Sequence, residues 1–329
     1  MAKILVTGGA GYIGSHTVYH LLRAGFDVIV VDNLSRGHRR NVDPARLRQF
    51  DLAETRLLAA LCREERFDAV VHFAGYIAVG ESVRLPELYF RNNVGGTLSL
   101  LDAMRENGIG RLVFSSSAAV YGEPRENPIR EEQPCDPVSP YGESKLIVER
   151  LVRWLDECGG LRSISLRYFN ACGAEPGSGL GEAHDPETHL IPLLLRAVKN
   201  GQPLTIFGDD YDTPDGTCIR DYIHVSDLAS AHIAALEWLL AGGATEVLNV
   251  GTGRGHSVRE VIRAVEEVTG RQVPFVVGPR RPGDAPALVA NSGKLRQALG
   301  WAPRYTALRD IVATAWEYEK NREAIGGNP

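Results

Sequence analysis

"KILVTGGAGYIGSH", residues 3–16, contains the strand, turn and helix that decide the fold of this 329-residue chain. An apolar strand pattern leads into three glycines, spaced Gly8-x-x-Gly11-x-x-Gly14, and a helix pattern follows. Glycines permit a tight turn and a close approach to a pyrophosphate, and the helix N-terminus offers free N–H groups. The stretch therefore predicts a nucleotide site, against the alternative of a glycine-rich turn that binds nothing.

Short apolar runs alternate with helix patterns throughout the first half of the chain. The expected strands span residues 3–8, 27–32, 47–51, 69–75, 111–117 and 163–170. The expected helices span residues 12–24, 54–65, 83–106 and 141–157. Short apolar strands separated by helices predict a parallel sheet that is covered on both faces. We therefore expect an α/β protein with a doubly wound (Rossmann) sheet.

The second half of the chain has a different pattern. Residues 171–189 are rich in glycine, proline and polar residues and read as a long loop, which in a compact domain usually has a function. The elements expected beyond it are helices near 190–199, 226–240, 257–269, 292–299 and 307–322, and strands at 204–208, 218–225 and 246–251. We expect a smaller C-terminal α/β lobe that binds substrate. The predicted domains are 1–170, with 220–251 returning to it, and 171–219 plus 252–329.

Composition excludes several classes of function. The net charge of -5, without a basic tract, argues against nucleic acid or an anionic membrane as a partner. No apolar run approaches the ~20 residues of a membrane span, and the N-terminus has no signal-peptide pattern. Five scattered cysteines without a CxxC motif indicate neither disulfides nor a zinc site. We expect a cytoplasmic protein without a metal.

Two acidic residues follow the second and third expected strands. Asp32 lies where the adenosine ribose of a bound dinucleotide is expected, and a carboxylate there repels a 2′-phosphate. It favours NAD over NADP, although Arg36, Arg39 and Arg40 follow nearby. The alternative for Asp32 is a turn residue that caps the chain at Leu34. Asp51 suits either the adenine amino group or a helix cap.

A possible acid–base pair lies in "SPYGESK", residues 139–145. Tyr141 and Lys145 are four residues apart, so on a helix their side chains share a face. A lysine beside a phenol favours the phenolate, which is a base. Ser117 ends the expected strand at 111–117, and ligands bind at the carboxyl ends of parallel strands. The alternative is a surface pair without function.

At this point the sequence resembles a known family. The motifs that carry the resemblance are TGGAGYIG, DNL at 32–34, FAG with VGES, YFRNNVGGT, SSSAAVYG, SPYGESK, LRYFN and RDYIHV. In this order they resemble the extended short-chain dehydrogenase/reductases, and more narrowly the UDP-glucose (UDP-galactose) 4-epimerases. The resemblance runs from residue 3 to residue 318. It implies a homodimer that uses NAD to invert C4 of a UDP-sugar through a 4-keto sugar.

The resemblance also implies roles for individual residues. Tyr141 is the general base, Lys145 its partner on the nicotinamide ribose, and Ser117 a hydrogen-bond partner of the sugar 4-hydroxyl. The cofactor residues that it implies are Gly8, Gly11, Tyr12, Ile13, Gly14, Asp32, Asn33, Asp51, Leu52, Phe73, Ala74, Gly75, Asn92, Ser115, Tyr141, Lys145 and Tyr168. The substrate residues that it implies are Ser117, Tyr141, Asn170, His189, Leu190, Phe207, Arg220, Arg281, Asp284 and Leu288.

Sister activities and departures from the family pattern narrow the prediction. Ala118 and Ala119 stand where related 4,6-dehydratases need an acidic pair, so dehydration is not expected. Ile77 replaces a lysine that grips the cofactor in many relatives. The resemblance implies that Leu288 lies beside the sugar C2 substituent. Because leucine is of moderate size, N-acetylated UDP-sugars remain candidate substrates. UDP-pentoses are further candidate substrates, and a non-catalytic NAD-binding regulator is the alternative function.

Overall fold

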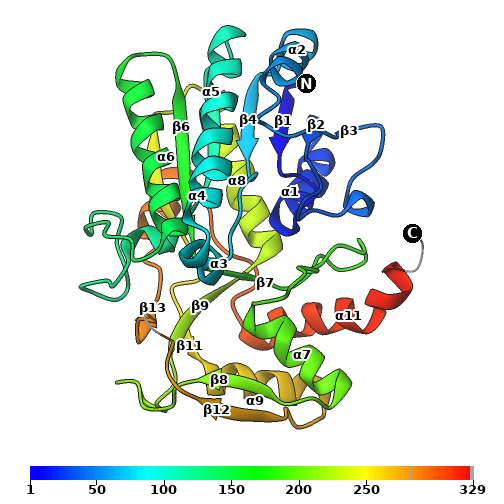
Figure 1. Cartoon of the computed structure of the whole chain (residues 1–329), viewed down its shortest axis with the longest axis vertical. Coiled ribbons are helices and arrows are strands. Elements are labelled where there is room, and N and C mark those ends of the chain that lie inside the picture. Colours follow the sequence, from blue (N-terminus) through cyan, green and yellow to red (C-terminus); the bar gives the residue numbers. More distant parts are fainter. Residues whose placement is uncertain (282–283, 327–329) are drawn as a thin grey trace.

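The computed structural model describes residues 1–281 and 284–326, with side chains up to residue 322. Figure 1 shows a larger lobe that contains the N-terminus, and below it a smaller lobe formed by the second half of the chain. The larger lobe is built on a parallel seven-stranded sheet with the order β10-β6-β5-β4-β1-β2-β3. The predicted doubly wound sheet is therefore confirmed, and its strand order reverses between β1 and β4.

The bounds of the elements agree closely with the sequence patterns. The strands of the large sheet are β1 (Lys3–Thr7), β2 (Asp27–Val31), β3 (Leu47–Arg48), β4 (Ala69–His72), β5 (Arg111–Ser117), β6 (Arg162–Tyr168) and β10 (Glu246–Val250). Its helices are α1 (Tyr12–Arg23), α2 (Thr55–Glu65), α5 (Gly96–Glu106), α6 (Pro140–Glu157), α8 (Val225–Leu240) and α10 (Gly293–Leu299).

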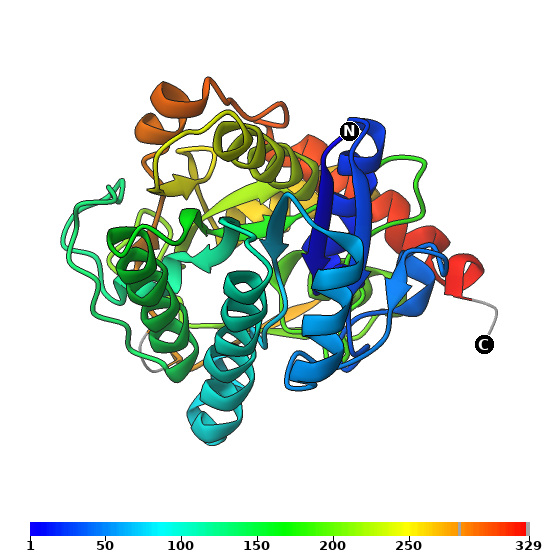
Figure 2. The ribbon, with the colours of Figure 1, turned by 90° about the horizontal axis from the view of Figure 1, so that it is seen from above.

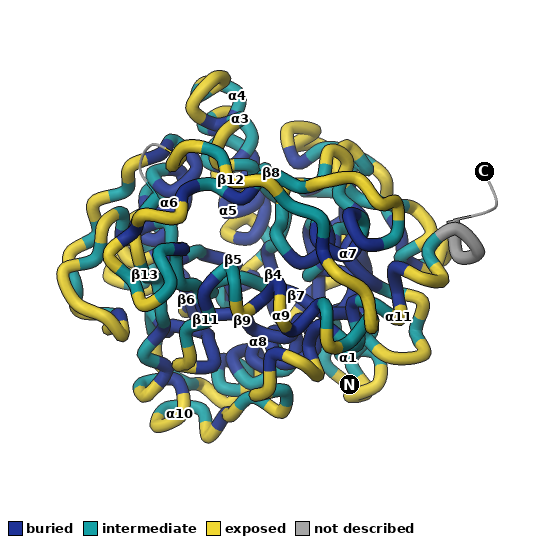
Figure 3. The backbone as a smooth tube through the Cα atoms, turned by 90° about the horizontal axis from the view of Figure 1, so that it is seen from below, coloured by how far each residue is buried: buried dark blue, intermediate teal, exposed yellow. Residues whose placement is uncertain are grey.

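Helices cover both faces of the large sheet. Leu21 of α1, Leu236 of α8 and Leu295 of α10 pack with one face, while α2, α5 and α6 cover the other. Figure 2 shows these two layers from above, and Figure 3 shows buried residues along the central strands. Burial on both faces explains why these strands read as continuous apolar runs.

The smaller lobe has its own core and two small sheets. Its strands are β7 (Asn170–Cys172), β8 (Leu204–Phe207), β9 (Ile219–His224), β11 (Gly255–Ser257), β12 (Phe275–Gly278) and β13 (Ala287–Leu288). Its helices are α7 (Leu190–Asn200), α9 (Val258–Thr269) and α11 (Leu308–Gly326). Within the predicted returning segment 220–251, β10 joins the large sheet and β9 joins a small one. Among the described residues, none of the helices is long and apolar enough to cross a membrane.

The single helix expected near 83–106 is wrong in detail. The chain instead forms α3 (Val79–Arg84), α4 (Pro86–Tyr89), a π-helical turn (Phe90–Gly95) and then α5. Proline lacks an N–H group, and its ring crowds the preceding turn, so a helix restarts at Pro86. The strands β7, β11, β12 and β13 were not expected separately because two to four residues carry too little pattern.

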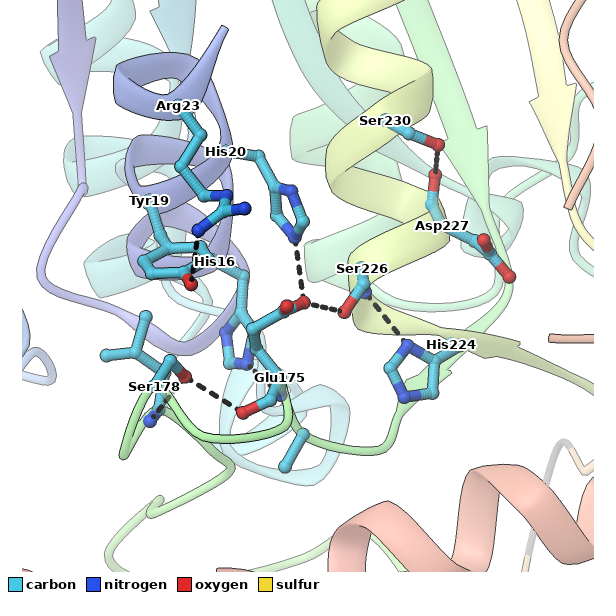
Figure 4. A network of polar contacts seen from close by, with 12 residues as sticks. His16, Tyr19, His20, Arg23, Glu175, Ser178, His224, Ser226, Asp227 and Ser230 are labelled. Atoms are coloured by element: carbon cyan, nitrogen blue, oxygen red, sulfur yellow. Dashed lines mark hydrogen bonds and ion pairs between the residues drawn. The ribbon is translucent and has the colours of Figure 1, made fainter. Parts of the chain in front are cut away.

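A polar network fastens α1 to the start of α8 and to the loop after β7 (Figure 4). The Glu175 carboxylate pairs with His20 Nε2 at 2.9 Å and accepts a hydrogen bond from the Ser226 hydroxyl at 2.6 Å. The backbone N–H of Glu175 donates to His16 Nε2 at 3.2 Å. The other ring nitrogen of His16 lies 2.7 Å from the Tyr12 carbonyl, so the neutral ring donates there. The helix that follows the glycine turn is thereby tied to the loop beside the smaller lobe.

Buried histidines make the protein sensitive to acid. Burial lowers the pKa of His16 and His232 to about 4, and that of His72 and His224 to about 3. Below pH 6.5 the unfolded chain takes up protons that the folded chain refuses, so stability falls as the pH falls. Each histidine lowers the free energy of unfolding by up to about 2 kcal/mol between pH 7 and pH 5.

Urea unfolding at pH 7 and pH 5, followed by circular dichroism, measures this loss. We expect a lower midpoint at pH 5. His232→Phe removes one of these proton-binding groups while it keeps a ring against Phe73 and Tyr168. This variant is expected to show a smaller difference between the two pH values. An equal midpoint at both pH values for the unaltered chain would contradict the prediction.

Candidate active site

A cavity of about 1900 Å³ lies at the carboxyl ends of the large-sheet strands, with residues of both lobes in its lining. Single ligand pockets are usually about 300–1,000 Å³, so this cavity has room for a dinucleotide and a second ligand together. Every cofactor and substrate residue expected from the sequence lies in this lining. The structure therefore brings these residues, which are spread from Gly8 to Leu288 along the chain, to one cavity.

The glycine turn has the geometry that a pyrophosphate requires. Gly8 has a φ of +73°, and a Cβ there would lie 2.5 Å from the Ala74 nitrogen. A Cβ on Gly14 would lie 2.2 Å from the Gly8 carbonyl oxygen. Gly11 is the N-cap of α1 and has no side chain to occupy the N–H groups of the first turn. Gly11, Tyr12 and Ile13 line the cavity, so the N-terminus of α1 lies there, where free N–H groups would suit an NAD pyrophosphate.

Asp32 makes the turn contact considered for it and keeps acceptor capacity at the cavity. One carboxylate oxygen accepts from the Ala10 N–H at 2.9 Å, and the other accepts from the Leu34 N–H at 2.8 Å. The cap at Leu34 is therefore present. Burial raises the pKa of Asp32, and these two N–H groups lower it in part. Each carboxylate oxygen accepts more than one hydrogen bond, so Asp32 is still able to bind a ribose diol at the cavity.

Neighbours of Asp32 form the end of the cavity where the sequence places the adenine of NAD. Asp51 accepts from the Asn33 side chain at 2.6 Å, and its other oxygen caps Ala53 at 2.8 Å. Leu52 forms the apolar part of this wall. Phe73, Ala74 and Gly75 follow β4, where the strand order reverses, and Asn92 and Tyr168 also lie in the lining. Both interpretations of Asp51 therefore stay open.

The Tyr141–Lys145 pair lies at the start of α6. Ser139 is the N-cap, and its hydroxyl accepts from the Gly142 N–H at 3.1 Å. Lys145 Nζ donates to the Ser115 carbonyl at 2.8 Å and lies 5.9 Å from the centre of the Tyr141 ring. Ser117 ends β5 and caps the following turn through the Ala119 N–H at 3.2 Å. A phenol, an ammonium group and a hydroxyl therefore meet at one place in the cavity.

Burial opposes the charged forms of both catalytic candidates. It raises the pKa of the Tyr141 phenol, and the Ser117 hydroxyl lowers it in part. Burial also lowers the pKa of Lys145 to about 8, although Glu149 raises it. In the protein alone, the phenol pKa thus moves away from the value near 7 that a base needs. The positive charge of an oxidised nicotinamide ring would reverse this direction.

Two arginines predicted to bind substrate line the cavity and are held by contacts with neighbouring residues. Arg220 donates to the carbonyl oxygens of Ile219 and Ala285 and pairs with Asp284 at 3.2 Å. The Arg281 guanidinium lies 4.0 Å from the centre of the Phe207 ring. Asn170 ends this wall near β6. Guanidinium groups suit phosphate oxygens, and an aromatic ring suits a base.

A cluster of histidines and glutamates lies at the start of α7, and sequence reasoning found only its last member. His189 Nδ1 lies 2.7 Å from Glu182 and 2.9 Å from Glu187, and Arg196 also pairs with Glu187 at 3.2 Å. Burial would lower the pKa of His189, but these carboxylates raise it above its usual range. The ligand atoms of Glu182, His184, Glu187 and His189 lie within 4.8 Å of one another, a group that could hold a metal ion. The charges of the two glutamates are already balanced by His189 and Arg196.

Two further residues were not predicted as site residues from the sequence. Asn93 is buried, accepts from the Tyr76 N–H at 2.8 Å and donates to the Ser144 hydroxyl at 3.0 Å, which ties the loop after β4 to α6. Arg36 lies 5.2 Å from the centre of the Tyr76 ring and lines the cavity beside Ile77. The RNN run gave a weak signal for Asn93, whereas Arg36 was considered only as an argument for NADP.

Comparisons with known proteins agree with this geometry. Residues 4–251 match the family described as "NAD dependent epimerase/dehydratase family". A UDP-glucose 4-epimerase of Lacticaseibacillus casei is 49% identical over 97% of both chains. The crystal structure of a UDP-glucose 4-epimerase from Brucella ovis in complex with NAD is 46% identical, with a TM-score of 0.94 over 97% of this chain and 98% of that one. A Bifidobacterium longum UDP-glucose 4-epimerase in complex with NAD+ and UDP is 39% identical, with a TM-score of 0.92 over 97% and 98%.

Proposed function

This chain belongs to the NAD-dependent epimerase/dehydratase family, and we propose that it interconverts UDP-glucose and UDP-galactose by inverting C4 of the sugar. The observation that carries the proposal is the meeting of Tyr141, Lys145 and Ser117 in the cavity that the glycine turn also lines. A non-catalytic regulator would have no use for this acid–base constellation.

The roles of the chain's own residues follow from their positions. When bound, NAD supplies the hydride acceptor and, on return, the hydride donor for C4. Tyr141 takes the proton of the sugar 4-hydroxyl and later returns it to the same oxygen, after the sugar has presented the opposite face of C4. Ser117 orients the 4-hydroxyl, and Lys145 holds the nicotinamide ribose and stabilises the phenolate. Arg220, Arg281 and the residues around them hold the UDP part while the sugar turns over.

The experiment that tests the proposal begins with an absorbance spectrum of the purified protein without added cofactor. UDP-galactose and UDP-glucose are then offered separately, and the epimers are quantified by chromatography. We expect co-purified NAD and conversion in both directions. The absence of any turnover of either sugar, with NAD bound, would overturn the proposal. The UDP-pentoses would be the second pair to test.

The size of residue 288 is expected to set the tolerance at the sugar C2 position. Leu288 lines the cavity and packs against the hydrophobic cluster that contains Tyr121, Ile129 and Leu146. We propose that it leaves space for an N-acetyl group, so that UDP-N-acetylglucosamine is converted as well. Leu288→Tyr is expected to lower kcat/KM for the N-acetylated sugar by about 10-fold or more, while activity on UDP-galactose changes little.

Parallel assays of the unaltered chain and Leu288→Tyr with both sugars measure this ratio. Leu288→Met, which conserves volume, is the matched control and is expected to keep both activities. Equal losses on both sugars in Leu288→Tyr would contradict a role in selectivity.

We propose that the protein is a cytoplasmic homodimer whose interface contains α5 and α6. These helices cover the same face of the sheet and carry the exposed apolar side chains of Leu98 and Trp154, the latter 60% exposed. Sedimentation velocity is expected to show a dimer, and Trp154→Glu to shift it toward the monomer. Val276→Glu, at a similarly exposed position on β12, is the control that should leave the dimer intact. A monomeric unaltered chain would overturn this proposal.

A further inference from the structure

A buried ion pair lies directly behind the catalytic candidates. Glu149 is one helical turn beyond Lys145 and two beyond Tyr141, so the three share a face of α6. Arg167 of β6 binds Glu149 side-on, with Nε at 2.9 Å from one oxygen and Nη2 at 2.5 Å from the other. Both residues are buried, and neither is among the residues that line the cavity.

The pair is joined to the strand that carries Ser117. The Ser116 hydroxyl donates to the same Glu149 oxygen that Arg167 Nε binds. Ser116 and Arg167 are direct partners in the β5–β6 register, so one carboxylate holds two adjacent strands at the same level. One residue earlier, the Ser115 carbonyl accepts from Lys145, and one residue later Ser117 reaches the cavity.

Arg167 extends the network to the turn after β5. Its Nη1 donates to the Tyr121 hydroxyl at 2.9 Å, and Tyr121 in turn donates to the Asn249 side chain at 2.7 Å. Tyr121 closes the short turn Ala118–Tyr121, which Ser117 begins. Both ends of the turn that presents Ser117 are therefore fastened, one through Glu149 and one through Arg167.

We propose that Glu149 and Arg167 are positioning residues for the acid–base chemistry of Tyr141, Lys145 and Ser117. The pair fixes the register of α6 against β5 and β6, and the Glu149 carboxylate supports the charge of the Lys145 ammonium group. This inference rests on the proposed function for its kinetic readout. Other titratable groups that face this network or Tyr141 are Tyr121, Cys135, His72 and Tyr168. The Glu131 carboxylate acts on the network through Tyr121.

A merely structural ion pair would affect stability alone, so the test must read the acid–base site itself. Glu149→Gln keeps the shape and the hydrogen bond to Ser116 but removes the negative charge. We expect the apparent pKa values of Tyr141 and Lys145 to fall by about one unit, because the charged phenolate gains and the ammonium loses stabilisation. The pH profile of kcat then shifts to lower pH, and kcat falls by about 10-fold while KM changes little.

Phenol ionisation gives a readout that does not need activity. Ultraviolet difference titration of the holoenzyme, with Tyr141→Phe subtracted, reports the Tyr141 pKa even if the proposed function is wrong. Glu149→Asp retains the charge and is expected to keep the pH profile of the unaltered chain. A folded Glu149→Gln with an unchanged titration would overturn the proposal.

Arg167→Lys keeps the test decisive if Glu149→Gln fails to fold. Lysine retains the charge but loses the side-on pairing and the bond to Tyr121. We expect a kcat about 10-fold lower, an unchanged KM and an unchanged pH profile. A kcat equal to that of the unaltered chain would overturn the positioning role.

Discussion

Tyr141→Phe is expected to lower kcat at least 1,000-fold, a large effect for general acid–base catalysis, which contributes about 10²–10⁴-fold. The substitution removes one hydroxyl from a buried ring and leaves the ring in place beside Lys145. The Tyr168 phenol also lines the cavity, but burial raises its pKa and its hydroxyl is hydrogen-bonded with Ser115, so we do not expect it to take over the proton of the sugar 4-hydroxyl. Co-purified NAD and the melting temperature are expected to stay near their original values.

Tyr211→Phe is the matched control for this loss. Tyr211 is also buried, its hydroxyl finds no hydrogen-bond partner among the described residues, and it lies outside the cavity lining. Its substitution is expected to leave kcat within about twofold, as for substitutions away from special features. If Tyr141→Phe kept kcat within tenfold of the original value, the assignment of the base would be wrong.

The protein around Tyr141 opposes ionisation of its phenol. Burial raises the pKa of Tyr141 in the protein alone, and Lys145 with its lowered pKa of about 8 gives limited help. Ionisation of the phenol would therefore rely on the positive charge of an oxidised nicotinamide ring, when one is bound. Sequence spacing predicted the pair but not this conflict, because desolvation depends on all the elements packed around α6.

The sequence predicted the large sheet well because each strand is buried on both faces and reads as one apolar run. Val28 to Val31 show this, since β2 is flanked by helices on both sides. The smaller lobe was less predictable because β11 and β13 are two or three residues long and exist through pairing with β9. No local pattern marks a strand of that length.

The candidate site shows the same contrast between features with a local sequence pattern and features that arise only in the fold. The glycines and the Tyr141–Lys145 pair have fixed local spacing, so their motifs are visible in the sequence. Glu182 and Arg167 act through partners 7 and 18 residues away, and nothing in their local spacing predicts those contacts. Asn93 has a partner 51 residues away and is marked only weakly, by the RNN run. Only the fold brings those partners together.

Gly14→Ala is expected to have the second large effect, the loss of bound NAD. The new Cβ would lie 2.2 Å from the Gly8 carbonyl oxygen and 2.9 Å from the Gly9 Cα. The turn has little freedom to retreat, because the Gly8 N–H is bonded to the Val31 carbonyl at 2.8 Å. The clash therefore displaces the N–H groups that face the pyrophosphate. Overpacking of this kind costs about 1–3 kcal/mol of stability.

A displacement near 1 Å at a binding loop lowers activity by about 100-fold, so Gly14→Ala should purify with little NAD and low activity. The absorbance spectrum of the purified variant and its activity with added NAD measure both effects. Gly110→Ala is the matched control, since its Cβ would lie 3.7 Å from the Gly160 carbonyl oxygen, an ordinary contact, and Gly110 lies outside the cavity lining. If Gly14→Ala purified with a full complement of NAD, the turn would have adjusted without displacing its N–H groups. The close packing of Gly14 against Gly8 would then not be required for cofactor binding.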